Sequence, residues 1–211
     1  MNYLKIDKED VSNGSGLRVV LWLSGCSHKC KGCQNPQTWD NNSGILFDES
    51  AKEELFRELD KDYISGITLS GGDPLFETNL DDVLDLVNEI NERYNKAQYI
   101  DADKRNKYNI LMKNGNKTRL LLPKKTIWIY TGYEWEHIFS NEFHYHPLTT
   151  EKISVERWKR QQIVSQSDVL VDGRYIENKR DITIKWRGST NQNVIDIQRS
   201  LNEKKIILWC N

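Results

Sequence analysis

The stretch Cys26-Ser27-His28-Lys29-Cys30-Lys31-Gly32-Cys33 places three of the chain's four cysteines within eight residues, at C-x3-C-x2-C spacing. A structural zinc site takes four ligands, often from two Cys-x-x-Cys pairs, and this stretch supplies three cysteines and then stops. Thiolates also bind iron–sulfur clusters, which normally take four cysteines. The spacing therefore predicts a 4Fe-4S cluster held by Cys26, Cys30 and Cys33, with one iron open to a bound reactant.

The sequence argues against two other uses of these cysteines. A disulfide framework is disfavoured, because four cysteines in 211 residues, without a recognisable signal peptide, do not resemble a secreted scaffold. Zinc bound by the three cysteines and His28 would need a ligand two residues from the next, a spacing that zinc sites rarely use. His144 and His146 lie beside Pro147 with no third ligand nearby, so we expect a surface loop there.

The composition fits a single domain over residues 1–211 with one sizeable core, since 37% of the residues are hydrophobic. Thirty Lys and Arg against thirty-one Asp and Glu give a net charge of −1, unlike a dedicated nucleic-acid binder. No apolar run approaches the roughly 18 residues of a membrane span. We therefore expect no membrane contact and no direct nucleic-acid contact. Because clustered thiols favour a reducing compartment, we expect a cytoplasmic protein.

The elements around the cysteines predict a parallel α/β sheet. Residues 17–23 are β-branched and aromatic and end at Ser24-Gly25, so Cys26 should lie on the loop at the carboxyl end of a strand. Strand, helix and strand then alternate, as in βαβ units. The further expected elements are a helix over about Glu49 to Asp60 with a capping box from Ser50, a strand over 66–70, a helix capped by Thr78 or Asn79, strands over 126–130 and 168–173, and mostly helical residues over 134–166.

The regular alternation breaks at residues 93–123, where two apolar runs flank Asn114-Gly115. This pattern predicts an inserted β-hairpin. Its lysines and arginines suit either the protection of exposed strand edges or electrostatic docking of a partner. A second insertion is expected at about residues 137–165.

The loop Gly71-Gly72-Asp73-Pro74 has a chemistry of its own. Glycines at the end of a strand let the backbone approach a ligand closely, and Asp73 adds a carboxylate that suits a cationic amino group. We therefore expect a side chain at Gly72 to fill the space of a bound ligand.

With its cysteine spacing followed by a Gly-Gly-Asp-Pro loop, the chain resembles the radical S-adenosylmethionine enzymes, whose corresponding loop is of the Gly-Gly-Glu type. The resemblance implies a partial (βα) barrel, here with an inserted β-hairpin. It also implies that the open iron chelates the amino and carboxylate groups of S-adenosylmethionine, whose reductive cleavage releases a 5′-deoxyadenosyl radical.

A closer resemblance is to the family of anaerobic ribonucleoside-triphosphate reductase activating proteins, the activases of glycyl radical enzymes. It is carried by blocks that span the chain in order: Met1-Asn2-Tyr3, residues 10–16, 24–33, Thr38-Trp39, residues 70–75, 128–133 and 169–173, Arg187-Gly188-Ser189 and Asn191-Gln192. The family's reaction removes a hydrogen from a glycine of the class III reductase. The implied partners are the catalytic subunit of that reductase and a flavodoxin-type electron donor.

Carried over by this resemblance, Cys26, Cys30 and Cys33 are the metal ligands. Gly32, Cys33 and Gln34 would flank S-adenosylmethionine at the cluster loop, and Gly72 would hold it at the glycine loop. Asp73 would contact it directly or stand behind it. Thr131 and Gly132 are expected neighbours of its adenosine or carboxylate, with a structural turn as the alternative. Asp172, Gly173 and Arg174 would orient the partner or the cofactor, and a strand-ending turn is the alternative for Asp172 and Gly173.

Two other functions remain open at this point. A small radical S-adenosylmethionine enzyme acting on a free metabolite, such as a deazaguanine synthase, would share the cysteines and the glycine loop. A zinc-stabilised binding module would use the basic hairpin to contact nucleic acid. The fourth cysteine, Cys210, is far in sequence from the others, and we expect a free thiol.

Overall fold

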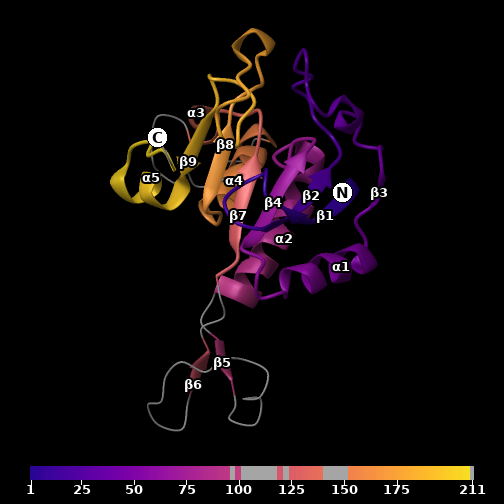
Figure 1. Ribbon diagram of the computed structural model, residues 1–211, viewed down its shortest axis with the longest axis vertical. Helices are drawn as coiled ribbons and strands as arrows, with labels where there is room; N and C mark the ends of the chain where they lie inside the picture. The colour runs from indigo at the N-terminus through magenta and orange to yellow at the C-terminus, as the bar shows by residue number, and fades with distance from the viewer. Residues whose placement is uncertain (96–97, 101–117, 121–123, 140–151, 210–211) are drawn as a thin grey trace.

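A computed structural model describes residues 1–95, 98–100, 118–120, 124–139 and 152–209 (Figure 1). Its main sheet has seven strands in the order β3-β1-β2-β4-β7-β8-β9. Four central neighbours, β2, β4, β7 and β8, are parallel, and β1 and β9 flank them as antiparallel strands. The strands are β1 (Asn2–Asp10), β2 (Arg18–Leu23), β3 (Ile45–Leu46), β4 (Gly66–Gly71), β7 (Thr126–Tyr130), β8 (Val169–Asp172) and β9 (Asn193–Asp196). The predicted α/β class with a parallel core is confirmed.

One face of the sheet carries the main hydrophobic core. Leu21, Leu69, Ile129, Leu170 and Ile195 are paired in register across five strands, and all five are fully buried. They form one cluster with apolar residues of α1, α2 and α4, so these three helices lie on the same face. The helices are α1 (Glu49–Leu59), α2 (Leu80–Ile90), α3 (Trp135–Phe139), α4 (Lys152–Ser165) and α5 (Ile197–Glu203). None of the helices in the described residues is long and apolar enough to cross a membrane.

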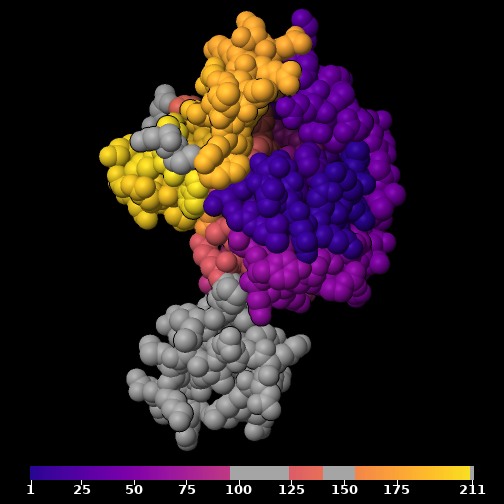
Figure 2. All heavy atoms as spheres, in the orientation of Figure 1, coloured from indigo at the N-terminus to yellow at the C-terminus, as the bar shows by residue number. Residues whose placement is uncertain are grey.

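The opposite face is covered by the N-terminal segment, which lies across the front of the molecule in the space-filling view (Figure 2). Its anchor is Arg18, a fully buried arginine whose guanidinium lies 5.3 Å from the ring centre of Trp128. Arg18 donates to Thr68 Oγ1 at 2.8 Å and to the Ser15 carbonyl at 3.1 Å. A buried charge is tolerated only when it is hydrogen-bonded, and here backbone carbonyls and hydroxyls meet that need.

Three features differ from the sequence predictions. Strand β1 was not predicted, because its residues alternate with charges and it lies towards the edge of the sheet. The expected hairpin around Asn114-Gly115 is not described, but β6 (Thr118–Leu120) pairs antiparallel with β5 (Gln98–Ile100), upstream of the strand we expected. The second expected insertion contains α4, which contributes the fully buried Ile163 and Val164 to the core.

The first helix starts at Glu49 as predicted, but its N-cap lies two residues before the predicted Ser50. The N-cap of α1 is Asp48, whose side chain accepts a hydrogen bond from the Ala51 amide at 3.0 Å. We expect Asp48→Ala to lower the free energy of unfolding by about 1 kcal/mol, because the Ala51 amide in the first turn of α1 would lose its hydrogen-bond acceptor. Ser50→Ala should lower the free energy of unfolding far less, as measured by urea unfolding. Equal losses in the two variants would mean that Ser50 caps the helix after all.

Candidate metal centre

The cysteines lie on the loop that follows β2, which we call the cluster loop (residues 24–35). Its base is held by two backbone bonds, from the Gly25 amide to the Thr38 carbonyl at 2.8 Å and from the Cys26 amide to the Trp39 carbonyl at 3.1 Å. Cys26, Cys30 and Cys33 are free thiols of intermediate exposure. The loop therefore presents three unpaired sulfurs at the carboxyl end of a parallel strand.

The surroundings of the thiols favour their protonated form before a metal binds. Burial and the nearby Asp73 carboxylate raise the pKa of Cys26 to about 11. Burial also raises the pKa of Cys30, against a lowering contribution from a backbone hydrogen bond of Tyr175. Because only thiolates bind metal, loading of this loop must release protons.

The donor set fits an iron–sulfur cluster better than a closed single-ion site. Among the described residues, no three His, Cys, Asp or Glu side chains converge as one metal ion requires. With a Zn–S bond of about 2.3 Å, tetrahedral zinc would draw its sulfurs to within about 3.8 Å of one another. His28, the fourth ligand of the zinc alternative, has its Nε2 3.0 Å from the Asp73 carboxylate.

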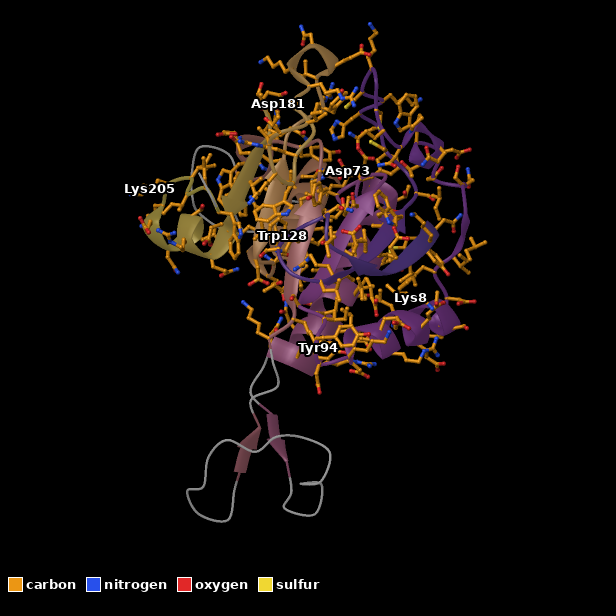
Figure 3. The ribbon with its side chains drawn as sticks, viewed as in Figure 1. Lys8, Asp73, Tyr94, Trp128, Asp181 and Lys205 are labelled. Atoms are coloured by element: carbon orange, nitrogen blue, oxygen red, sulfur yellow. The ribbon has the colours of Figure 1, made fainter. Side chains whose placement is uncertain are left out.

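Asp73, at the upper end of the sheet in Figure 3, is the junction of three loops. Its side chain is buried, and its Oδ1 accepts from the Leu75 amide and from Thr131 Oγ1, both at 2.8 Å. Its Oδ2 accepts from the Gly132 amide at 3.0 Å. The structure thus brings Asp73, Thr131 and Gly132 together, as expected for one site, but the carboxylate is already occupied by protein donors.

Asn79 ties the glycine loop to the cluster loop. We predicted either Thr78 or Asn79 as the cap of α2, but the Asn79 side chain makes no capping bond to that helix. Instead its Nδ2 donates to the Ser24 carbonyl at 2.8 Å and to the Asp73 carbonyl at 3.1 Å. Such long-range bonds cannot be read from a capping pattern, which describes only the nearest residues.

Gly72 is required by the approach of two backbones. A Cβ at this position would lie 2.5 Å from the Gly25 carbonyl oxygen and 3.0 Å from the Gly25 nitrogen. The Gly72 amide donates to the Leu23 carbonyl and the Asp73 amide to the Gly25 carbonyl, both at 2.7 Å. Our expectation that a side chain here would chiefly fill ligand space was therefore incomplete, since it would first strike the start of the cluster loop.

A segment after β8 that the sequence did not point to lies against the cluster loop. Glu177 pairs with Lys31 at 3.2 Å, and a Cβ on Gly32 would meet the Glu177 side chain at 3.1 Å. The Tyr175 backbone lies near enough to the Cys30 thiol to lower its pKa. Gly32 and Gln34 are exposed on this loop, and the Cys33 sulfur accepts from the Asn35 amide at 3.3 Å.

The remaining sequence blocks build the support behind this segment. Asp172 is buried and accepts from the amides of Trp135 at 2.9 Å and Asn193 at 3.1 Å, while burial raises its pKa. Gln192 Oε1 accepts from the Gly188 amide at 3.0 Å, and its Nε2 donates to the Gly173 carbonyl at 2.9 Å. For Asp172 and Gly173 these bonds favour the structural alternative.

A cleft of about 810 Å³ opens beside Cys26, between the cluster loop and the residues that follow it. Trp39 and Phe76 supply aromatic walls, and Gln37 and Asn41 supply polar groups. Its size is within the range of small-molecule sites. Cys210, His144, His146 and most of the predicted hairpin lie outside the described residues.

Comparison with known proteins connects this geometry to a family. The family model described as "4Fe-4S single cluster domain" matches residues 12–102 and 103–195. The anaerobic ribonucleoside-triphosphate reductase-activating protein of Enterobacteria phage T4 is 34% identical over 192 residues, which cover 91% of this chain and 92% of the relative. Proteins of the same name from Haemophilus influenzae and Escherichia coli K12 are 30% and 32% identical, with 91% of this chain and 96% of each relative covered.

Proposed function

The chain belongs to the family of anaerobic ribonucleoside-triphosphate reductase-activating proteins with a 4Fe-4S single cluster domain, and from this premise we propose its reaction. It activates a class III reductase by reductive cleavage of S-adenosylmethionine at a 4Fe-4S cluster and removal of a hydrogen atom from a glycine of the reductase. The product is a glycyl radical on the partner. The observation that carries the proposal is the set of three free thiols on one loop, joined to the glycine loop through Asp73 and Asn79.

The order of the parallel strands supports a partial barrel of the radical S-adenosylmethionine type. Strands β2, β4, β7 and β8 are neighbours in the sheet in the same order as in the chain. Because crossovers between parallel strands are right-handed, such an order puts every connecting helix on one face. Helices α1, α2 and α4 share one core face here, so the opposite face, on which Arg18 and the N-terminal segment pack, would be the inside of such a barrel.

Within this proposal each residue of the site has a task. Cys26, Cys30 and Cys33 hold the cluster, and Gly32, Gln34, Gly72 and Thr131 line the space for S-adenosylmethionine. When bound, the two groups together supply the 5′-deoxyadenosyl radical, and the protein's part is to hold, orient and shield them.

Asp73 stands behind the site in this proposal. The hydrogen bonds of its carboxylate come from Leu75, Thr131 and Gly132, and His28 faces it, so it fixes the loop ends that meet the cofactor. The electron for reductive cleavage comes from a flavodoxin-type donor. These assignments rest on the family and on the positions of the residues at one end of the sheet.

The test is anaerobic reconstitution with iron and sulfide, followed by mixing the reduced protein with S-adenosylmethionine and a class III reductase. We expect about four irons per chain, the number in one 4Fe-4S cluster. We also expect 5′-deoxyadenosine formation and a radical on the reductase by electron paramagnetic resonance. Omission of S-adenosylmethionine is the control. Cofactor cleavage without a radical on the reductase would point to a free metabolite as substrate, and stoichiometric zinc without iron would overturn the cluster itself.

A further inference from the structure

His28, between the first two cysteines, is turned inward, away from solvent. Its side chain is only 6% exposed, although both neighbours, Ser27 and Lys29, are exposed. Its Nε2 lies 3.0 Å from Asp73 Oδ2, but the contact lacks the geometry of a good hydrogen bond, and Nδ1 is buried without a partner among the described residues. The imidazole is therefore fixed mainly by its packing.

Tyr133 forms one wall of the His28 pocket. The His28 and Tyr133 rings meet edge to face, with their centres 4.7 Å apart. The guanidinium of Arg160, on α4, lies 4.4 Å from the centre of the same tyrosine ring and donates to its hydroxyl at 3.0 Å. Arg160 also donates to the Leu75 carbonyl at 2.9 Å. Arg160 of α4 thus fixes the Tyr133 ring and also binds the backbone at Leu75, directly after the glycine loop.

Gly132 forms the other wall. A Cβ at this position would lie 2.3 Å from the His28 ring, well inside normal contact. No left-handed backbone angle demands a glycine here, so the absent side chain is explained by the room that His28 occupies. The ring therefore fits between Gly132, Tyr133 and Asp73, at the ends of β4 and β7.

We propose that His28 is a positioning residue that locks the cluster loop onto the ends of β4 and β7, so that Cys26 and Cys30 are held for the cluster. The inference rests on the proposed function, since it concerns the loading of the same cysteines. A metal-binding loop that is free to move must be ordered when the metal binds, which weakens binding. A loop held by His28 before binding avoids much of that cost.

The test measures iron retention after anaerobic reconstitution, with a strong iron chelator added at a temperature far below the unfolding midpoint. We expect His28→Ala to lose iron about 10-fold faster or more than the wild type, the range typical of residues that orient metal ligands. His28→Gln, whose amide nitrogen reaches the place of Nε2, should recover part of the retention. His137→Ala is the matched control, because that histidine side chain is 66% exposed.

Gly132→Ala reaches the same contact from the other side without removing a polar group. We expect rapid iron loss from this variant as well, because the added methyl group displaces the imidazole. In the double variant the methyl enters vacated space, so its rate should match that of His28→Ala alone. Rates that multiply would show two independent defects and overturn the proposal.

The outcomes separate this inference from the proposed function. A wild-type protein that binds no iron and sulfide would overturn both. Wild-type loading together with unchanged retention in His28→Ala and Gly132→Ala would overturn only the positioning role. If His28→Ala fails to fold by circular dichroism, Gly132→Ala and His28→Gln decide the question. If both Gly132→Ala and His28→Gln then retain iron as the wild type does, the positioning role of His28 is overturned.

Discussion

Replacing Cys26, Cys30 or Cys33 by alanine is expected to abolish cluster binding and, with it, activation of the reductase. Among the described residues no three His, Cys, Asp or Glu side chains converge for a metal, so no substitute ligand stands in place beside the loop. Loss of one thiolate leaves two protein ligands for a cluster that normally takes four. Iron and sulfide content and the radical yield on the reductase should both fall to background in each variant.

Cys210→Ala is the matched control for these three substitutions, since it also removes one thiol. It should keep wild-type iron content, because three cysteines already account for the protein ligands in the proposed site. A Cys210→Ala protein that loses its cluster, or a Cys30→Ala protein that keeps a full one, would show that the ligand set is wrong. Folding of the metal-free variants is compared by circular dichroism, so that a missing ligand is not confused with a missing fold.

The core of the fold was predictable because its signals are local. Strands β4, β7 and β8 are short apolar runs that end in turn formers, and α2 has apolar residues at helical spacing. Strand β1 gave no such signal, because β3 pairs with it only at Asn2 and Tyr3, and charged side chains such as Lys5 and Glu9 further along β1 are exposed. Strands β5 and β6 pair across residues 101–117. The residues of the two strands carry no local pattern that predicts a pairing partner so far away in the chain.

The site divides in the same way. The cysteine spacing and the Gly-Gly-Asp-Pro loop could be read directly, because their chemistry depends on neighbours in the chain. The contacts of Tyr175 and Arg160 with this region depend on the order of the strands and on the packing of α4, which bring distant residues together. The bridging role of Asn79 was hidden behind a capping signal of the same residue type.

Gly72 should be the glycine of the site least tolerant of a side chain. The pairing of β2 with β4 ends at Leu23 and Gly71, and the two amide bonds from Gly72 and Asp73 continue it into the loops. An added methyl group would stand 2.5 Å from the Gly25 carbonyl oxygen, immediately before Cys26. Backbone on both sides leaves no flexible group to move aside, so the loops must separate.

We therefore expect Gly72→Ala to lower the free energy of unfolding of the metal-free protein by about 1–3 kcal/mol, the usual cost of overpacking. Iron content after reconstitution should fall as well, because Cys26 moves with Gly25. Urea unfolding and iron analysis measure the two effects.

Gly132→Ala is the matched contrast, because its methyl group would clash with the His28 side chain and His28→Ala would remove that clash. The clash at Gly72 involves backbone atoms, so His28→Ala should not relieve it. Wild-type stability and loading in Gly72→Ala would mean that the two loops do not approach as closely as their hydrogen bonds require.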